Sequence, residues 1–168
     1  NSHVGACEAN GVTYEGNVSH GNGATGVSIM YNSKFTFEDG SISGNSSDGQ
    51  AHGVLFVYPS IGGACEVHLK DVDISNNVFT STSSYYFIAL DNAAHTTTFE
   101  NVTIDHNESA STQACGFIQL GSNNTLTWTG GSLSHNVINF TSGYALLCVG
   151  YGNYGATAEL RDVDITHN

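Results

Sequence analysis

A nine-residue segment recurs five times without gaps, and this repeat constrains the fold more than any other feature of the chain. The copies occupy residues 37–45, 69–77, 99–107, 128–136 and 160–168, so they start 32, 30, 29 and 32 residues apart. The first residue is aromatic or Leu, the fourth is Gly or Val, the sixth is Ile or Leu, and the ninth is always Asn. A period of about 30 residues is typical of a solenoid.

A second, apolar part precedes each copy of the segment. Runs at residues 26–31, 53–58, 86–90, 116–120 and 143–149 have the length and content of buried strands. Within the segment, positions 4 and 6 alternate as in a strand, whereas the spacing from position 1 to position 4 breaks the alternation. We therefore expect a bend between two short strands there, followed by a polar stretch of variable length.

These features predict an all-β fold, a right-handed parallel β-helix of about five to six coils with ~30 residues and three short strands per coil. The handedness follows from the rule for parallel crossovers. The alternative, a β-sandwich, requires hairpin turns but not the same Asn at near-constant spacing. We expect residues 1–168 to form a single domain, with 1–25 as a degenerate first coil and 26–168 as regular coils. In that first coil, the sixth copy lies around residues 14–22 and Val18 is placed opposite Ile42.

Stacked coils convert each repeated position into a ladder along the axis. The sixth position predicts an internal aliphatic ladder of Ile42, Ile74, Ile104, Leu133 and Ile165. The ninth position predicts a ladder in a turn, where side-chain amides cap backbone groups, made of Asn45, Asn77, Asn107, Asn136 and Asn168.

The charge balance excludes several classes of partner. Lys and Arg together number three against 15 carboxylates, which gives a net charge of −12. This balance argues against nucleic acid, anionic membranes and acidic polysaccharides, because binding them requires Lys and Arg. No apolar run reaches the ~18 residues that span a bilayer, so membrane insertion is not expected. Neutral sugars, cations, another protein or further copies of the chain remain.

The segment from Ile42-Ser-Gly-Asn45 to Gly53-Val-Leu resembles the repeats of polymorphic-membrane-protein-type adhesins. That family pairs an aromatic-or-aliphatic-x-x-Asn motif with a downstream Gly-Gly-Ala-aliphatic motif. This chain differs in having Ile or Leu before x-x-Asn, and its Gly62-Gly-Ala64 lies elsewhere in the coil. The resemblance covers most of residues 35–168 and implies a β-helix of the pectin-lyase-like architecture, secreted or on a cell surface, used for adhesion or as a stalk.

Two groups of side chains are candidates for chemistry. Carboxylates recur at outward positions, and glycoside hydrolysis needs two of them about 5–9.5 Å apart; the set is Asp39, Asp71, Asp73, Asp105, Asp162 and Asp164. Histidines precede the ladder Asn in three successive copies, so His106, His135 and His167 are weak candidates for a metal such as Zn²⁺ or Cu²⁺. The simpler interpretation is a solvated face and stacked turn residues, so we expect no catalytic residue, no metal and no cofactor.

Six glycosylation sequons occur, at Asn17, Asn45, Asn101, Asn107, Asn123 and Asn139. Asn45 and Asn107 lie at ladder positions, which leaves Asn17, Asn101, Asn123 and Asn139 as the candidates for N-glycans in a eukaryotic secretory context. The four cysteines form no close pair, and we favour at least one disulfide among Cys7, Cys65, Cys115 and Cys148.

No polar or helical cap is recognisable at either end of the repeat. The chain is thus expected either to belong to a longer solenoid or to pair its last coil with the first coil of another copy, head to tail. The function expected first is that of an extracellular or cell-surface structural protein, not an enzyme, that stacks into a filament and carries glycans. The alternatives are an adhesin that binds glycans through loops at 79–85 and 151–154, and a polysaccharide-active enzyme using Asp71 and Asp73 with Asp39 or Asp105.

Overall fold

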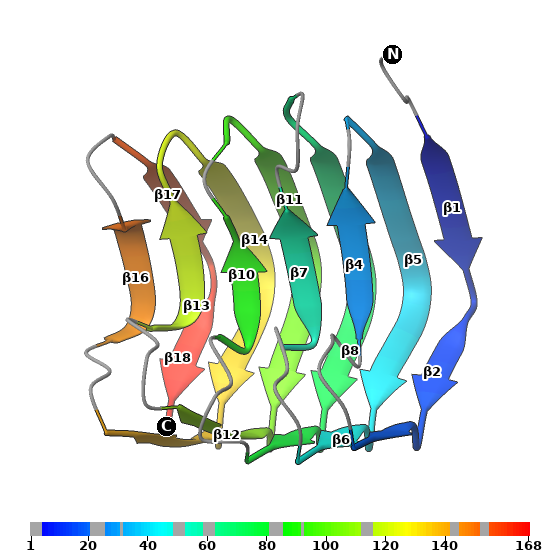
Figure 1. The fold of residues 1–168 in the computed structure, drawn as a ribbon, viewed down its shortest axis with the longest axis vertical. Helices are drawn as coiled ribbons and strands as arrows, with labels where there is room; N and C mark the ends of the chain where they lie inside the picture. The colour runs from blue at the N-terminus through cyan, green and yellow to red at the C-terminus, as the bar shows by residue number, and fades with distance from the viewer. Residues whose placement is uncertain are drawn as a thin grey trace.

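The protein is a parallel β-solenoid. The computed structural model describes residues 5–20, 26–30, 32–48, 53–58, 63–80, 86–91, 93–111, 116–141, 145–151 and 155–168. Within these ranges the strands form three parallel sheets that run along one axis (Figure 1). They contain no helix long and apolar enough to cross a membrane.

Each coil passes through the three sheets in the same order. The long sheet comes first and contains β1 (Ala6–Asn10), β2 (Thr13–Glu15), β5 (Lys34–Ser43), β8 (Glu66–Ser75), β11 (Thr96–Asp105), β14 (Thr125–Ser134), β17 (Thr157–Arg161) and β18 (Asp164–Thr166). The short sheet follows, with β3 (Val18–Ser19), β6 (Ser46–Ser47), β9 (Val78–Phe79), β12 (Glu108–Ser111) and β15 (Val137–Phe140). The apolar sheet closes the coil, with β4 (Val27–Met30), β7 (Leu55–Tyr58), β10 (Ile88–Leu90), β13 (Gly116–Gly121) and β16 (Ala145–Tyr151).

The register of the long sheet confirms the repeat. The first positions of the five segments are direct partners on neighbouring strands, in the order Phe37, Leu69, Phe99, Trp128 and Leu160. Four unbroken ten-residue strands, β5, β8, β11 and β14, define about four regular turns, slightly fewer than the five to six coils expected. The long-sheet rungs at the two ends are each split into two shorter strands. The right-handed sense stays a prediction from the crossover rule.

The expected bend lies at the third position of the segment. Asp39, Asp71, Asn101 and Asp162 have φ between 52° and 53°, and Gly130 has φ 69°. A single left-handed residue turns the chain, which explains why positions 1 and 4 both face inward. In the four regular turns the strand continues through this bend, so the segment lies on one bent strand where two short strands were expected.

The short-sheet strand of each coil lies directly after the ladder Asn, in the stretch that we expected to be a polar connection. These short-sheet strands bury one side chain each in the middle coils: Ser47, Phe79 and Ser109 are at most 2% exposed. A two-residue strand with Ser at its inward position has no apolar alternation to reveal it. Phe79 was assigned to a candidate binding loop, which is wrong, because its ring packs in the core edge-on to Phe87 at 5.7 Å.

The expected alignment of the first coil is also wrong. Tyr14, not Val18, pairs with Ile42, and Val18 pairs with Ser46. The first copy of the segment therefore runs from residue 9 to residue 17, 28 residues before the second. Ala9 stands where the later copies have an aromatic residue or Leu, and Tyr14 stands where they have Ile or Leu, which hid this copy.

Candidate functional site

The Asn ladder runs along the solenoid axis, just after the C-terminal ends of the long-sheet strands. The same three hydrogen bonds connect each pair of neighbouring coils. The backbone N–H of one Asn donates to Oδ1 of the next at 3.0–3.1 Å. Its Nδ2 donates to the same Oδ1 at 2.8–3.0 Å. In the opposite direction, each Nδ2 reaches the carbonyl of the sixth-position residue one coil back, as Asn107 does to Ile74 O at 2.9 Å. Asn45, Asn77, Asn107 and Asn136 are at most 3% exposed, as predicted for an internal ladder.

Asn17 is a sixth member of this ladder that sequence reasoning missed. Its Nδ2 donates to Oδ1 of Asn45 at 2.9 Å, in the same geometry as the later pairs. The signal that marks it is the pair Gly11 and Gly16, whose φ values of 64° and 67° match the two left-handed positions of every later copy. Asn17 was a glycosylation candidate, yet its amide nitrogen is already used within the ladder.

The ladder is polar, so its two ends differ chemically. Every Asn donates to the Oδ1 of its neighbour on the C-terminal side. At the edge formed by β1, β2 and β3, the ladder therefore ends on an acceptor, Oδ1 of Asn17. At the edge formed by β17 and β18 it ends on a donor, the backbone N–H of Asn168, because Nδ2 of Asn168 already donates to Leu133 O at 2.8 Å and to Thr166 O at 3.1 Å. The two edges of the described solenoid are thus complementary to each other, not to themselves.

Inward side chains become exposed at the same two edges. Ile74 and Ile104 are 0% exposed, whereas Ile165, at the same position of the last described coil, is 46% exposed. At the other edge Val12 is 45% exposed, although Val72 at its position in a middle coil is 2% exposed. The aliphatic ladder is therefore internal in the regular coils and open to solvent on β18.

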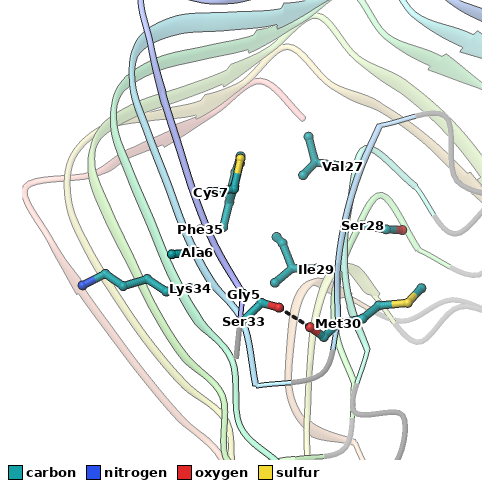
Figure 2. A pocket seen from close by; sticks show the side chains of 10 residues that line it. All are labelled: Gly5, Ala6, Cys7, Val27, Ser28, Ile29, Met30, Ser33, Lys34 and Phe35. Carbon is teal, nitrogen blue, oxygen red and sulfur yellow. Dashed lines mark hydrogen bonds between the residues drawn. The ribbon is translucent and has the colours of Figure 1, made fainter. Parts of the chain in front are cut away.

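A pocket of about 230 Å³ lies at the N-terminal edge between β1, β4 and β5. In Figure 2, Val27 and Ile29 on β4 face Cys7 and Phe35 on the long sheet, and the Lys34 side chain points away. Its walls are mainly apolar side chains that also border the core, so this edge exposes the interior of the solenoid.

The three histidines form a row on the surface. The rings of His106 and His135 stack at 4.9 Å between centroids, and those of His135 and His167 stack at 5.1 Å. Asp105 lies beside the first two: its Oδ2 is 2.5 Å from Nδ1 of His106, and its Oδ1 is 3.0 Å from Nδ1 of His135. Ser134 Oγ donates to the same Oδ1 at 2.8 Å.

The surroundings of Asp105 favour its carboxylate form. Partial burial by itself raises the pKa of Asp105, but hydrogen bonds from His106, Ser134 and His135 and the charge of His106 lower it more. The net effect places the pKa of Asp105 below its ordinary value. A carboxylate therefore persists between two imidazole nitrogens over the physiological range.

The other candidate carboxylates lie in amide and hydroxyl contacts along the long sheet. Asp71 Oδ1 accepts a bond from Asn101 Nδ2 at 2.7 Å, and Asp39 Oδ2 accepts one from Asn10 Nδ2 at 3.4 Å. Asp73 Oδ2 accepts from Ser75 Oγ at 2.6 Å. Asp39 and Asp71 stand on adjacent rungs as the spacing predicted, and Asp162 and Asp164 are exposed in the last coil. The expectation that the chain is not an enzyme stays a prediction.

The sequons divide by burial. Asn45 and Asn107 are buried and bonded in the ladder, as expected. Asn101, Asn123 and Asn139 are exposed. Asn101 is the one of these three whose amide nitrogen bonds a carboxylate, that of Asp71.

The structure shows no disulfide among the three cysteines that it describes, and the expected disulfide stays a prediction. Cys7, Cys65 and Cys148 are free thiols, exposed, buried and half-buried respectively. They lie on different sheets or rungs, since the coil places them at unrelated positions. Cys115 falls outside the described residues, as do 81–85 and 152–154 of the candidate loops.

No known protein family, curated protein or solved structure matches this chain. The likeness to surface adhesins therefore rests on the repeat motif alone, and the parallel β-solenoid rests on the coordinates.

Proposed function

We propose that this protein is an extracellular structural protein whose solenoid associates head to tail with further copies of itself to form a rod or filament. The single observation that supports the proposal most is the complementarity of the two edges. One edge offers the acceptor Oδ1 of Asn17 and the other offers the backbone N–H of Asn168, and both expose side chains that are buried in the middle coils. Contacts of this heterologous kind do not close and produce open filaments.

The contact is centred on the long sheet. At the C-terminal edge β17 and β18 form the outermost rung, whereas the short and apolar sheets end on β15 and β16. The β1 and β2 strands of an incoming copy pair with β17 and β18 in the register already used between neighbouring coils. The N-terminal pocket is then covered by apolar side chains, as each middle coil is covered by the next.

The surface chemistry supports an extracellular setting. The charge is −12. Asn139 lies on β15, the terminal strand of the short sheet, whereas the exposed sequons at Asn101 and Asn123 lie along the side of the solenoid. Glycans there are compatible with axial stacking. An intact mass of the secreted chain equal to the bare polypeptide would exclude them.

A single engineered cysteine tests the register of the contact. Cys7 lies in the same column of the long sheet as Phe35, Val67, Thr97, Leu126 and Ala158. Head-to-tail pairing of β1 on β17 brings Cys7 of one copy opposite Ala158 of another, at the ~5 Å separation between parallel strands that a disulfide can bridge. The A158C variant is therefore expected to form disulfide-linked ladders of the 168-residue chain under mild oxidation.

The control and the contrary result are direct. The double variant C7S/A158C removes the predicted partner and is expected to lose the ladder, which separates this contact from links through the other thiols. Negative-stain microscopy of the unmodified protein is expected to show rods. Monomers at ~100 µM with no cross-linking of A158C would overturn the proposal.

A further inference from the structure

The position before each ladder Asn requires a left-handed backbone but no particular side chain. Gly16, Gly44 and Asn76 fill it in the first three coils, with φ between 57° and 67°. The next three coils have His106, His135 and His167, with φ between 51° and 56°. Because Gly and Asn satisfy the turn at lower conformational cost, the backbone does not explain three successive histidines.

The position one residue earlier is also unusual in one coil. Register pairs place Glu15, Ser43, Ser75, Asp105, Ser134 and Thr166 in one column. Glu15 lies in the first coil, and in the later coils Asp105 is the carboxylate in a column of hydroxyls. It occurs in the coil where the histidines begin. The departure from the repeat thus gathers one carboxylate and two imidazoles at one place.

The geometry of this cluster suits a cation. One ligand atom from each of Asp105, His106 and His135 can be chosen so that all three lie within 4.8 Å of one another. Both Nδ1 atoms already point at the carboxylate, at 2.5 and 3.0 Å from its oxygens. Ligands at 2.0–2.2 Å from a common ion are about 3 Å apart, so binding requires only small side-chain rotations.

We propose that Asp105, His106 and His135 bind one divalent transition-metal ion, Zn²⁺ or Cu²⁺. Two imidazole nitrogens and one carboxylate oxygen form a donor set that suits these ions better than Mg²⁺ or Ca²⁺, which prefer oxygen alone. In the metal-bound form each neutral imidazole offers an unprotonated Nδ1 to the ion and carries its proton on Nε2. Side-chain exposures of 60%, 49% and 26% for His106, His135 and Asp105 leave room for water at the remaining positions.

His167 has a different role in this proposal. Its ring stacks on His135 with an angle of 3° between the planes, and it stands one coil farther from Asp105. His167 lies outside the group of ligand atoms within 4.8 Å of one another, which comes from Asp105, His106 and His135. His167 therefore covers one face of His135 and holds that ring in place without being a ligand.

Binding joins two coils, because Asp105 ends β11 and His106 follows it, whereas His135 follows β14. The folded state gains the binding free energy, so the metal is expected to raise the Tm of the chain. This effect does not depend on end-to-end assembly, so the metal site and the proposed filament can fail separately.

Titration calorimetry of the 168-residue chain with ZnCl₂ or CuCl₂, and thermal unfolding with and without each salt, test the site. The ligand variants copy residues that other coils already have at the same positions: D105S, H106N and H135N. We expect one ion per chain, and a loss of at least about tenfold in affinity in each variant. The electron paramagnetic resonance spectrum of bound Cu²⁺ is expected to show two nitrogen ligands, and one in H106N or H135N.

Two variants separate this site from general surface binding. H20N removes another exposed His–carboxylate pair, in which His20 Nδ1 lies 2.9 Å from Asp48 Oδ2 and which belongs to no three-ligand cluster among the residues that the structure describes. H20N and H167N are expected to bind within about threefold of the unmodified chain. The proposal is wrong if no saturable binding occurs below ~1 mM, if H20N or H167N weakens binding as much as H106N does, or if well-folded ligand variants keep full affinity.

Discussion

At the scale of single residues, a second buried row shows how one position accepts different side chains if each completes the same bond. Cys65, His95 and Asn124 precede three consecutive long strands. Cys65 N–H donates to Nδ1 of His95 at 2.9 Å, and His95 N–H donates to Oδ1 of Asn124 at 3.0 Å. The neutral His95 ring therefore has its proton on Nε2, which is buried without a hydrogen-bond partner among the described residues. Nothing in the nine-residue repeat predicted this row, because it lies outside the repeat.

The buried ring makes stability depend on pH. Burial lowers the pKa of His95 below its ordinary value of 6.5, and the charge of Asp91 opposes this more weakly. Because the unfolded chain then binds more protons than the folded chain, stability is full above pH ~6.5 and falls as the pH drops toward the folded pKa. The limiting slope is ~1.4 kcal/mol per pH unit. The H95N variant keeps an acceptor for Cys65 N–H, as Asn124 does for His95 N–H. We expect H95N to weaken the pH dependence of the unfolding free energy, measured with urea, between pH 5 and 6.5. An unchanged slope in H95N would contradict this assignment.

At the scale of elements, the bend of each long strand depends on how the first and fourth residues of the nine-residue segment pack against each other. A Cβ on Gly40 would lie 2.3 Å from the Phe37 ring, so the missing side chain makes room for that ring. The copy that begins with Trp128 also has Gly at its fourth position, Gly131, and Nε1 of Trp128 donates to Gly130 O at 2.9 Å. The choice of Gly or Val at the fourth position, visible in the sequence, thus reflects the local packing of each bend.

The bend of β14 gives a test of this packing. Gly131 has φ +89°, and a Cβ there would lie 2.1 Å from the carbonyl oxygen of Val102 on the neighbouring strand. We expect G131A to lose about 2–4 kcal/mol of unfolding free energy, because a left-handed conformation and overpacking both oppose it. The matched variant G155A, which meets nothing within 4 Å, is expected to stay within about 0.5 kcal/mol of the unmodified protein in the same denaturant experiment. Equal stability of the two variants would show that the strands separate freely at this bend.

At the scale of the whole molecule, the ladders impose a direction on the solenoid. Amide, aliphatic and backbone ladders all run along the axis of the solenoid (Figure 1). The three sheets enclose the core around this axis, whereas inward side chains of the outermost described coils are exposed at the edge strands. Such edges favour pairing with another strand unless something covers them. Head-to-tail assembly is the solution that the proposed function adopts.

Blocking one edge tests that solution without unfolding the chain. Ile165 is already 46% exposed on β18, so I165K is expected to change monomer stability by less than ~1 kcal/mol but to place a charge in the proposed contact. Light scattering after size-exclusion chromatography should find I165K monomeric at concentrations where the unmodified chain assembles. V78K is the control, since Val78 is 36% exposed on the side wall at β9 and is expected to assemble normally. Assembly of I165K equal to that of V78K would count against an axial contact.

Much of this architecture could be predicted because a solenoid converts sequence period into spatial contact. Asn at the ninth position of each segment and Ile or Leu at the sixth position predicted two internal ladders. Both ladders are internal in the regular coils. The bend was readable because positions 1 and 4 violate strand alternation. In these cases residues one period apart become neighbours, so the pattern along the chain is also the pattern along the axis.

The sequence by itself therefore determined the solenoid, its ladders and the apolar strands, because each of these repeats. Only the tertiary structure decided what does not repeat: that the first copy of the segment ends at Asn17, that Phe79 belongs to the core, and that Asp105 lies between His106 and His135. Those outcomes depend on register in a coil of atypical length, on two-residue strands without alternation, and on side-chain directions across neighbouring coils. A periodic pattern does not predict these three features, since each depends on contacts made in one coil and not repeated in the others.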